Sequence, residues 1–240
     1  MNVRRGITSI LGAAFLVLMA GMANATVLLS ENFDDVSLLP GAGWAIVNNS
    51  NPLGTSDWFQ GNGAIFPAHQ GADDSYVAAN YLSADPLGGN VSDWLLLPTL
   101  GLQNGDTLTF YTRTEAGSIF PDRLEVRLST NGSSTDVGNT DASVGDFGAL
   151  LLTINPTLAL GGYPEDWTAF SVVLSGLSGT TDGRLAFRYF VPDTTTNANY
   201  IGIDTLTIER AAAAPEPSSV LLLLFAAATA RSLSQKRRLL

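Results

Sequence analysis

The chain has 240 residues, with 22 carboxylates, 12 basic residues, one histidine and no cysteine. The absence of cysteine excludes disulfides, and one histidine alone cannot build a zinc cluster. Residues 26–210 hold six arginines against 21 carboxylates, a net charge of −15 that argues against a nucleic-acid partner and is compatible with divalent cations.

The first 25 residues have the organisation of a secretory signal peptide. Arg4 and Arg5 precede an apolar run over residues 10–22, which ends in small residues at Ala23 and Ala25. The run is shorter than the roughly 20 residues of a membrane-spanning helix, so an N-terminal anchor is the less favoured alternative. We therefore predict a signal helix within residues 1–25, removed by signal peptidase after Ala25.

The pattern of residues 26–210 predicts a single all-β domain. Short alternating or apolar runs are separated by Gly, Asn, Asp, Pro and Ser, and helical periodicity is nearly absent. Strands with no helices between them must bury their apolar faces on one another, which predicts a two-sheet antiparallel β-sandwich of the jelly-roll type. The predicted strands cover residues 27–33, 44–47, 76–80, 93–97, 107–113, 123–129, 149–154, 167–174, 184–191 and 200–208.

Alternation assigns the arginines of three strands to outward faces. Aliphatic and charged residues alternate over 123–128, and the same rule points Leu185, Phe187 and Tyr189 inward. If the three strands are neighbours, their arginines form a stripe that can hold acidic polysaccharide. The favoured alternative, given the excess of carboxylates, is cross-strand pairing with acids such as Glu115 and Glu125.

Two carboxylates interrupt the strand pattern and are candidate metal ligands. Glu31 shares the parity of Val27, so its side chain is expected to point toward the core, where an unpaired carboxylate is costly. Alternation breaks at Asp204 or Thr205, which predicts a bulge that re-aims Asp204. First and last strands often pair in closed sandwiches, so Glu31, Asp34 and Asp204 are predicted to converge on a structural calcium ion. An alternative of equal weight to the calcium site is a buried carboxylate that is hydrogen-bonded by backbone amides or by an arginine.

Motifs for catalysis are sparse, and the chain is predicted not to be an enzyme. His69 is expected to be an exposed loop residue, and no Gly-x-Ser-x-Gly motif accompanies it. A glycoside hydrolase needs only two suitably spaced carboxylates and is the less favoured alternative. Another alternative is a carbohydrate-binding module that stacks sugars on tryptophans, with core packing favoured for Trp94. The four tryptophans are Trp44, Trp58, Trp94 and Trp167.

The C-terminus has the most specific pattern in the chain. A small-residue linker, 211–214, precedes Pro215, Glu216 and Pro217, an apolar run over 220–230 and a basic end at 236–238. This order resembles the PEP-CTERM sorting signal, and the resemblance implies that a membrane-embedded exosortase of a Gram-negative bacterium recognises and cleaves the tail 215–240. By hydropathy alone, the run forms a hydrophobic helix in a membrane with its basic end cytoplasmic, although it is only about half the usual span. An ordinary short anchor or an interfacial tail is the alternative.

Six short motifs lie along the body, at residues 31–35 (ENFDD), 43–44 (GW), 92–98 (SDWLLLP), 110–113 (FYTR), 122–129 (DRLEVRLS) and 201–204 (IGID). With them the body resembles the choice-of-anchor J domain, which is similar to cleaved-adhesin domains of the MAM-like jelly-roll type. The resemblance implies a jelly roll with structural calcium held by Glu31 and Asp204, a role in adhesion and no catalytic centre. We expect a transiently membrane-anchored protein of the cell surface or extracellular matrix, acting in adhesion or structure within an extracellular polysaccharide layer.

Overall fold

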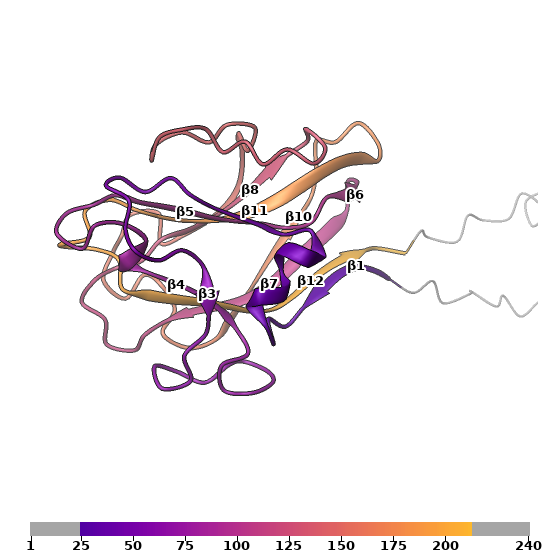
Figure 1. Ribbon diagram of the computed structural model, residues 1–240. Coiled ribbons are helices and arrows are strands. Elements are labelled where there is room, and N and C mark those ends of the chain that lie inside the picture. The colour runs from indigo at the N-terminus through magenta and orange to yellow at the C-terminus, as the bar shows by residue number, and fades with distance from the viewer. Residues whose placement is uncertain (1–24, 213–240) are drawn as a thin grey trace, which may run out of the picture. The chain divides into compact units, whose positions relative to one another are not determined.

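Two antiparallel sheets pack face to face in a computed structural model, which describes residues 25–212 (Figure 1). Sheet A has the order β10-β7-β12-β4-β3, with β1 added beside β12, and sheet B has the order β2-β5-β11-β8-β9, with β6 added beside β11. The strands are β1 (Thr26–Glu31), β2 (Ala45–Asn48), β3 (Phe59–Gln60), β4 (Val77–Asn80), β5 (Val91–Leu96), β6 (Leu100–Leu102), β7 (Asp106–Thr114), β8 (Leu124–Ser129), β9 (Ala149–Ile154), β10 (Thr168–Val173), β11 (Thr181–Val191) and β12 (Tyr200–Arg210). Three short 3-10 helices join them: η1 (Val36–Leu38), η2 (Pro40–Ala42) and η3 (Tyr81–Ser83).

The predicted all-β sandwich is confirmed, and every predicted strand corresponds to a strand of the structure. The predicted pairing of the first and last strands is also confirmed, because β1 runs antiparallel to β12. The sequence missed only β3 and β6, which are too short to display an alternation. Within residues 25–212, no helix has the length and apolarity needed to cross a membrane. The predicted signal helix and C-terminal hydrophobic helix lie outside the described residues.

The core lies between the two sheets and follows the predicted alternation. In β8, Leu124, Val126 and Leu128 are buried, and their counterparts in β11 pack beside them. Phe110 of sheet A meets Phe187 of sheet B edge to face, with ring centroids 4.8 Å apart. Burial of these side chains from both sheets is the main stabilising contribution that the sequence pattern encodes.

The condition for an arginine stripe, the less favoured alternative, is not met, because β7 belongs to sheet A whereas β8 and β11 pair in sheet B. The favoured cross-strand pairing is confirmed at Glu125, which accepts from Arg188 Nη1 of β11 at 3.3 Å. Glu125 also accepts from Arg127 Nε of its own strand at 2.7 Å. Arg188 is only 1 % exposed and lies 3.6 Å from the ring centroid of Phe190. Burial lowers the pKa of Arg188 to about 10, so it stays protonated at neutral pH.

The two ends of β12 define the two ends of the sandwich. Arg210 pairs with Thr26 of β1, so both termini of the domain leave from the same end (Figure 1). At the other end, Tyr200 pairs with Asn80, and Ile201 pairs with Thr114. Loops 81–90, 115–123 and 192–199 therefore meet at the end opposite the termini.

Candidate functional site

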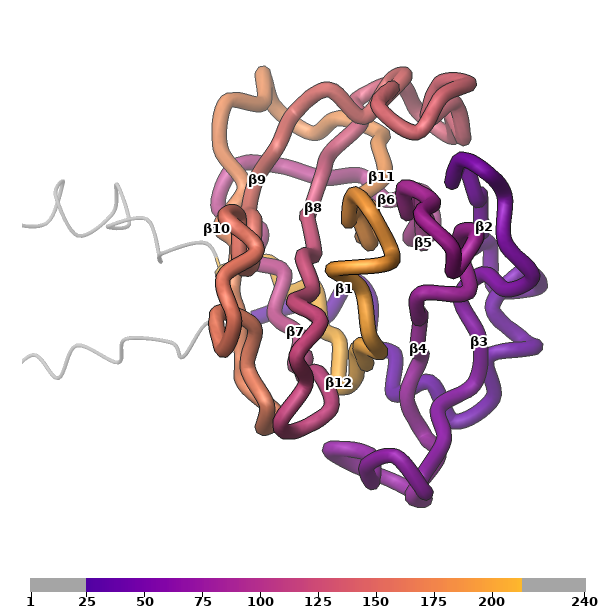
Figure 2. Tube along the Cα trace, turned by 90° about the vertical axis from the view of Figure 1, so that its left-hand side faces the viewer, coloured from indigo at the N-terminus to yellow at the C-terminus, as the bar shows by residue number. Residues whose placement is uncertain are grey.

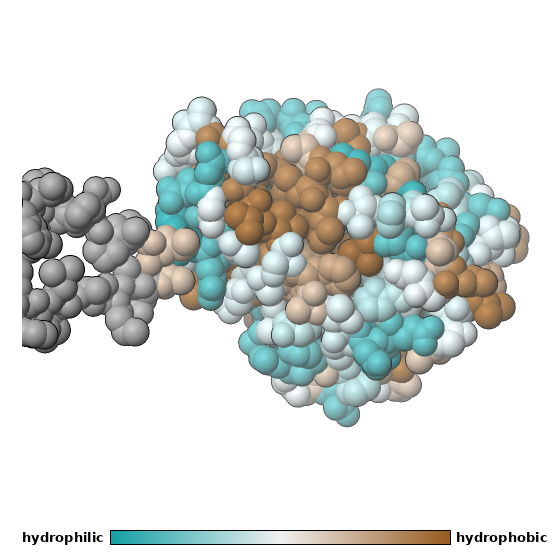
Figure 3. Space-filling view, turned by 180° about the vertical axis from the view of Figure 1, so that it is seen from behind, coloured by the Kyte–Doolittle hydropathy of each residue, from teal (hydrophilic) through white to brown (hydrophobic). Residues whose placement is uncertain are grey.

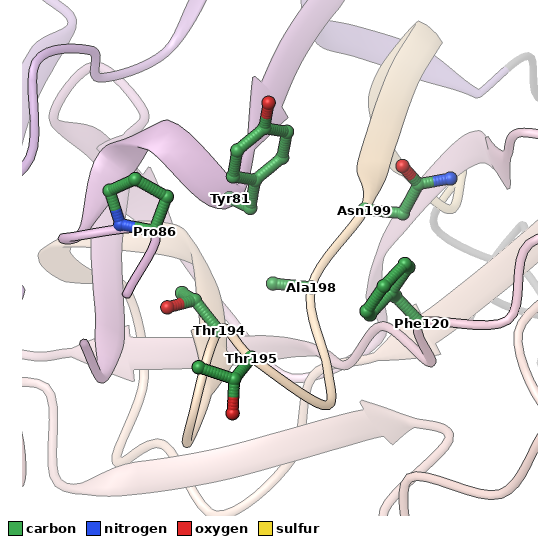
Figure 4. A pocket seen from close by; sticks show the side chains of 7 residues that line it. All are labelled: Tyr81, Pro86, Phe120, Thr194, Thr195, Ala198 and Asn199. Atoms are coloured by element: carbon green, nitrogen blue, oxygen red, sulfur yellow. The ribbon is translucent and has the colours of Figure 1, made fainter. Parts of the chain in front are cut away.

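A pocket of about 410 Å³ lies where these three loops meet (Figure 4). In Figure 4 the ring of Tyr81 lies above Ala198 and the ring of Phe120 lies to one side of it. Both rings are more than a third exposed, at 38 % and 37 %, although most large apolar side chains of the domain are buried. The pocket is lined by Tyr81, Pro86, Phe120, Thr194, Thr195, Ala198 and Asn199.

Local structure explains how the loops hold this shape. Asn80 caps η3 by accepting a hydrogen bond from the Leu82 amide at 2.9 Å, which fixes the turn that carries Tyr81. Ala198 has a φ of +68° and donates its amide to the Pro121 carbonyl at 3.0 Å. A left-handed conformation costs a non-glycine residue about 1 kcal/mol, so the surrounding contacts hold this loop in place.

Asn199 is the main polar side chain of the pocket, and its position is tightly held. Its side-chain amide nitrogen donates to Glu115 Oε2 at 3.0 Å, and its backbone carbonyl accepts from the Tyr81 amide at 3.1 Å. Its own backbone amide donates to Asp122 Oδ1 at 2.8 Å. These bonds present an amide to a ligand without a further ordering cost, as small-molecule sites require.

Asp122 supports the loop that carries Asn199 from inside the sandwich. Its carboxylate is fully buried and accepts from Thr114 Oγ1 at 2.6 Å and from the Tyr189 hydroxyl at 2.5 Å. Burial raises the pKa of Asp122 above its usual value of 3.8, although these hydrogen bonds oppose the shift. Because Asp122 is buried and bonded through both carboxylate oxygens, it supports the loop from within.

The electrostatic setting of the pocket disfavours anions. None of its lining residues is charged, but Asp193 and Glu115 are bonded to them. The hydroxyl of Thr195 donates to the half-buried Asp193 and lowers the pKa of its carboxyl below 3.8, so Asp193 is ionised at neutral pH. The arrangement can therefore hold a neutral ligand with an apolar face and hydroxyl groups.

The hypothesis that tryptophans form the binding surface is wrong for three of the four. Trp44, Trp58 and Trp94 are at most 4 % exposed and belong to hydrophobic clusters, which confirms the core role favoured for Trp94. Trp167 is half-buried and donates its Nε1 to the Pro67 carbonyl at 2.9 Å. Sequence reasoning missed Tyr81 and Phe120 because they come from separate loops with no shared pattern.

The predicted bulge near Asp204 is confirmed. The pairing of β12 with β7 shifts between Asp204 and Thr207, and Thr205 has a φ of +49°. Asp204 is fully buried, and its Oδ2 accepts from the amides of His69 and Gln70 at 2.8 and 3.0 Å. Its Oδ1 accepts from the Thr205 amide. Burial raises its pKa above 3.8 against the effect of these amides. The structure thus shows, at Asp204, the alternative in which backbone amides donate hydrogen bonds to a buried carboxylate.

The two other predicted calcium ligands lie near the same region. Glu31 is half-buried and accepts from the Phe33 amide at 2.8 Å. It lies opposite the buried Leu206 of β12, which agrees with the expected inward parity, although a register shift in β1 leaves Val27 out of phase and 55 % exposed. Asp34 is exposed, with its Oδ1 beside Gly71 of the loop that covers Asp204. In the part of the chain that the structure describes, no three acidic or histidine side chains are grouped to hold a metal.

His69 is not the exposed residue that the sequence suggested. It is half-buried, its ring stacks on Tyr111 with centroids 3.7 Å apart, and its Nδ1 lies 2.9 Å from Thr205 Oγ1. These contacts fasten loop 61–75 to the outer face of sheet A. We therefore assign His69 a structural role in this loop.

The remaining predicted residues lie at the limits of the described chain. Ala25 is the first described residue, and Ala23 of the cleavage motif lies outside. The sorting motif of Pro215, Glu216 and Pro217 lies outside as well.

The fold is shared with solved structures of cleaved adhesin domains from Lys-gingipain. The K3 domain from Porphyromonas gingivalis is 19 % identical, with a TM-score of 0.53 over 78 % of this chain and 100 % of that domain. The K1 domain from the same organism is 22 % identical, with a TM-score of 0.53 over 78 % and 99 %. The K2 domain is 17 % identical, with a TM-score of 0.52 over 75 % and 98 %. No family model and no curated protein matches the sequence.

Proposed function

We propose that this domain is a non-enzymatic adhesion domain that binds an extracellular glycan in the pocket between Tyr81 and Phe120. The observation that supports this most directly is the pair of exposed rings flanking a cavity of about 410 Å³. An aromatic face offers a large apolar contact at low entropic cost, and the apolar face of a sugar ring suits it. The amide of Asn199 supplies a directional contact to sugar hydroxyls. The fold shared with adhesin domains agrees with this role.

The sugar class follows from the charge around the pocket. Glu115 and Asp193 stand beside it, and no arginine lines it. A uronate would meet like charge with no compensating cation, which costs binding energy. We therefore propose a neutral pyranose unit within an extracellular polysaccharide as the ligand.

The ends of the domain fit display from a surface. Both termini leave from the end opposite the pocket, and the 11 residues of β12 separate the two ends by about 35 Å. We propose that signal peptidase releases residues 1–25 during export. The proposed choice-of-anchor J domain is then held at the membrane by the PEP-CTERM tail until an exosortase cleaves it. In that arrangement the pocket lies at the end of the domain opposite its termini.

Calcium is proposed as a structural ion near Glu31, Asp34 and Asp204. In support, Asp34 and Asp204 both approach loop 69–71, and the oxygens of Asp204 keep lone pairs beyond those used by amides. Because these side chains are not grouped as a metal site, loop 69–71 would have to adjust on binding. The ion would fasten this loop to β12 and would not contact a ligand in the pocket.

The glycan proposal is tested by titrating the isotopically labelled domain with neutral and uronic oligosaccharides, followed by NMR. Neutral sugars should shift the resonances of the pocket loops, and uronic ones should bind more weakly. Tyr81→Ala and Phe120→Ala should each weaken binding about tenfold, the equivalent of about 1.4 kcal/mol from one lost ring contact.

Ile119→Ala is the matched control, since Ile119 is 71 % exposed beside Phe120 and does not line the pocket. This variant should bind like the wild type. The proposal is refuted if no saccharide in the panel shifts the pocket resonances, or if the two ring variants bind as tightly as the control.

A further inference from the structure

An apolar flank runs along one side of the sandwich, where the edge strands of the two sheets lie. β10 ends sheet A and β9 ends sheet B, on the same side of the molecule (Figure 2). Seen from that side, Figure 3 shows a broad apolar surface. Leu150 of β9 and Val173 of β10 are 51 % and 63 % exposed. Between the edges, core-contacting side chains are only half-buried, among them Leu151, Leu152 and Phe170.

These two edges lack most of the features that normally protect a sheet edge, although β9 has a register shift. Charged residues, proline, bulges or very short length keep edge strands from pairing with other chains. β9 and β10 have six residues each and contain no charge, proline or glycine. By contrast, β3 at the other end of sheet A has two residues, and β1 carries Glu31 and a register shift.

β10 is the more regular of the two edges. Its pairing with β7 runs without interruption from Thr168 to Val173, whereas the pairing of β9 with β8 shifts beside Leu151. A straight strand can continue a ladder of hydrogen bonds, and a bulged one cannot. β10 is therefore the strand suited to pairing, with β9 supplying apolar cover.

The charge of the domain indicates which partner fits the flank. Residues 26–210 carry six arginines against 21 carboxylates, so two copies repel each other over most orientations. The uncharged flank is where that repulsion is least. A basic partner would instead be attracted to the carboxylate-bearing surfaces. An edge strand also matches its own copy, since antiparallel pairing about a two-fold axis uses the same residues on both sides.

We infer that two copies of this domain associate through the flank, with β10 pairing antiparallel to β10 of the second copy. Sheet A then continues across the two-fold axis, and the half-buried Phe170, Leu151 and Leu152 at the flank lose their remaining exposure. The contact is closed, so it yields a dimer and not a fibre. The inference does not depend on the glycan pocket, which lies at the end of the sandwich.

The test uses residues 26–210, which contain every strand of both sheets and belong to one compact unit with its own core. Sedimentation equilibrium in a series up to about 100 µM detects micromolar dissociation constants. The wild type should sediment as a dimer at the top of the series, and its β10 amides should exchange more slowly as concentration rises. Val173→Lys and Ala169→Lys, both at exposed positions of β10, should be monomers throughout, because lysine on an edge opposes pairing.

Val27→Lys is the matched control, because Val27 is 55 % exposed on β1, away from the flank. It should dimerise like the wild type, and all variants should melt like the wild type at low concentration, which shows that they fold. A wild type that stays monomeric up to the highest concentration overturns the inference. Dimers that persist in both flank variants overturn it as well.

Discussion

Replacing Asp93 by asparagine should change how the stability of the domain depends on pH. Asp93 lies in β5 and is fully buried; its Oδ2 accepts from Ser83 Oγ at 2.7 Å, and its Oδ1 has no partner among the described residues. Burial raises the pKa of Asp93 well above 3.8, and the charge of Asp57 adds to the shift. The folded state therefore favours the protonated acid. Its contribution to stability is complete below pH 3.8 and is lost as the pH rises toward the folded-state pKa.

The magnitude follows from proton linkage. The wild type loses at most about 1.4 kcal/mol per pH unit in that window, or about 2.7 kcal/mol between pH 4 and pH 6. Asparagine keeps an oxygen for Ser83 but does not titrate. Its amide nitrogen then occupies the place of the unpartnered Oδ1, at a constant cost of about 1–3 kcal/mol. The test is therefore how the difference in unfolding free energy between Asp93→Asn and the wild type changes with pH, and not how large that difference is at one pH.

Thermal unfolding by circular dichroism between pH 4 and pH 7 measures this difference. The melting temperature of Asp93→Asn relative to that of the wild type should rise by up to about 5–10 °C from pH 4 to pH 6, at about 2–4 °C per kcal/mol. Asp57→Asn, a control that leaves Asp93 buried, should keep most of the wild-type pH dependence, because burial is the larger cause of the shift. A difference between Asp93→Asn and the wild type that stays constant with pH would refute the reasoning.

Two further predictions concern β12. Arg210→Ala should destabilise the domain by about 3–5 kcal/mol in urea unfolding, because it leaves buried Asp106 without the guanidinium that donates to it at 2.8 and 2.9 Å. Although burial opposes ionisation, Arg210 lowers the pKa of Asp106, so the contribution of this ion pair to stability is present above pH 3.8 and lost on acidification. A loss of unfolding free energy in Arg210→Ala that is equal at pH 2 and pH 7 would contradict this prediction. Chelation of calcium should lower the melting temperature of the wild type and leave Asp204→Asn unaffected; identical curves for the chelated and calcium-loaded wild type would eliminate the proposed ion.

Alternation made the sandwich predictable, because a strand with one buried face shows its period in the sequence. In β8 and β11, Leu124, Val126, Leu185 and Phe187 lie in the core as their parity requires. The break at Asp204 was visible for the same reason, since a bulge shifts the apolar phase. In β1 the shift falls between Val27 and Leu29, where all three residues are apolar, so parity gave no warning.

The pocket was not predictable, because it depends on where loops meet. Phe120 and Asn199 are 79 positions apart and come together through the pairing of β7 with β12. Tryptophan was the wrong indicator of a binding surface, since its large apolar area is most often gained by the core. Trp58 illustrates this, being 2 % exposed although a polar loop precedes it.

An antiparallel dimer has a consequence for the proposed life cycle of the protein. Pairing β10 with its copy about a two-fold axis reverses the direction of the second domain, and β10 runs parallel to β12 because both flank β7 antiparallel. The two sets of domain termini then leave from opposite ends of the dimer. We therefore expect copies released by cleavage of the tail to pair more readily than copies tethered to one membrane. Two pockets at opposite ends, about 35 Å or more apart, would then join separate polysaccharide strands, and binding to both would add avidity without any new contact. Dimers should accordingly form more readily from the cleaved protein than from copies held in one bilayer.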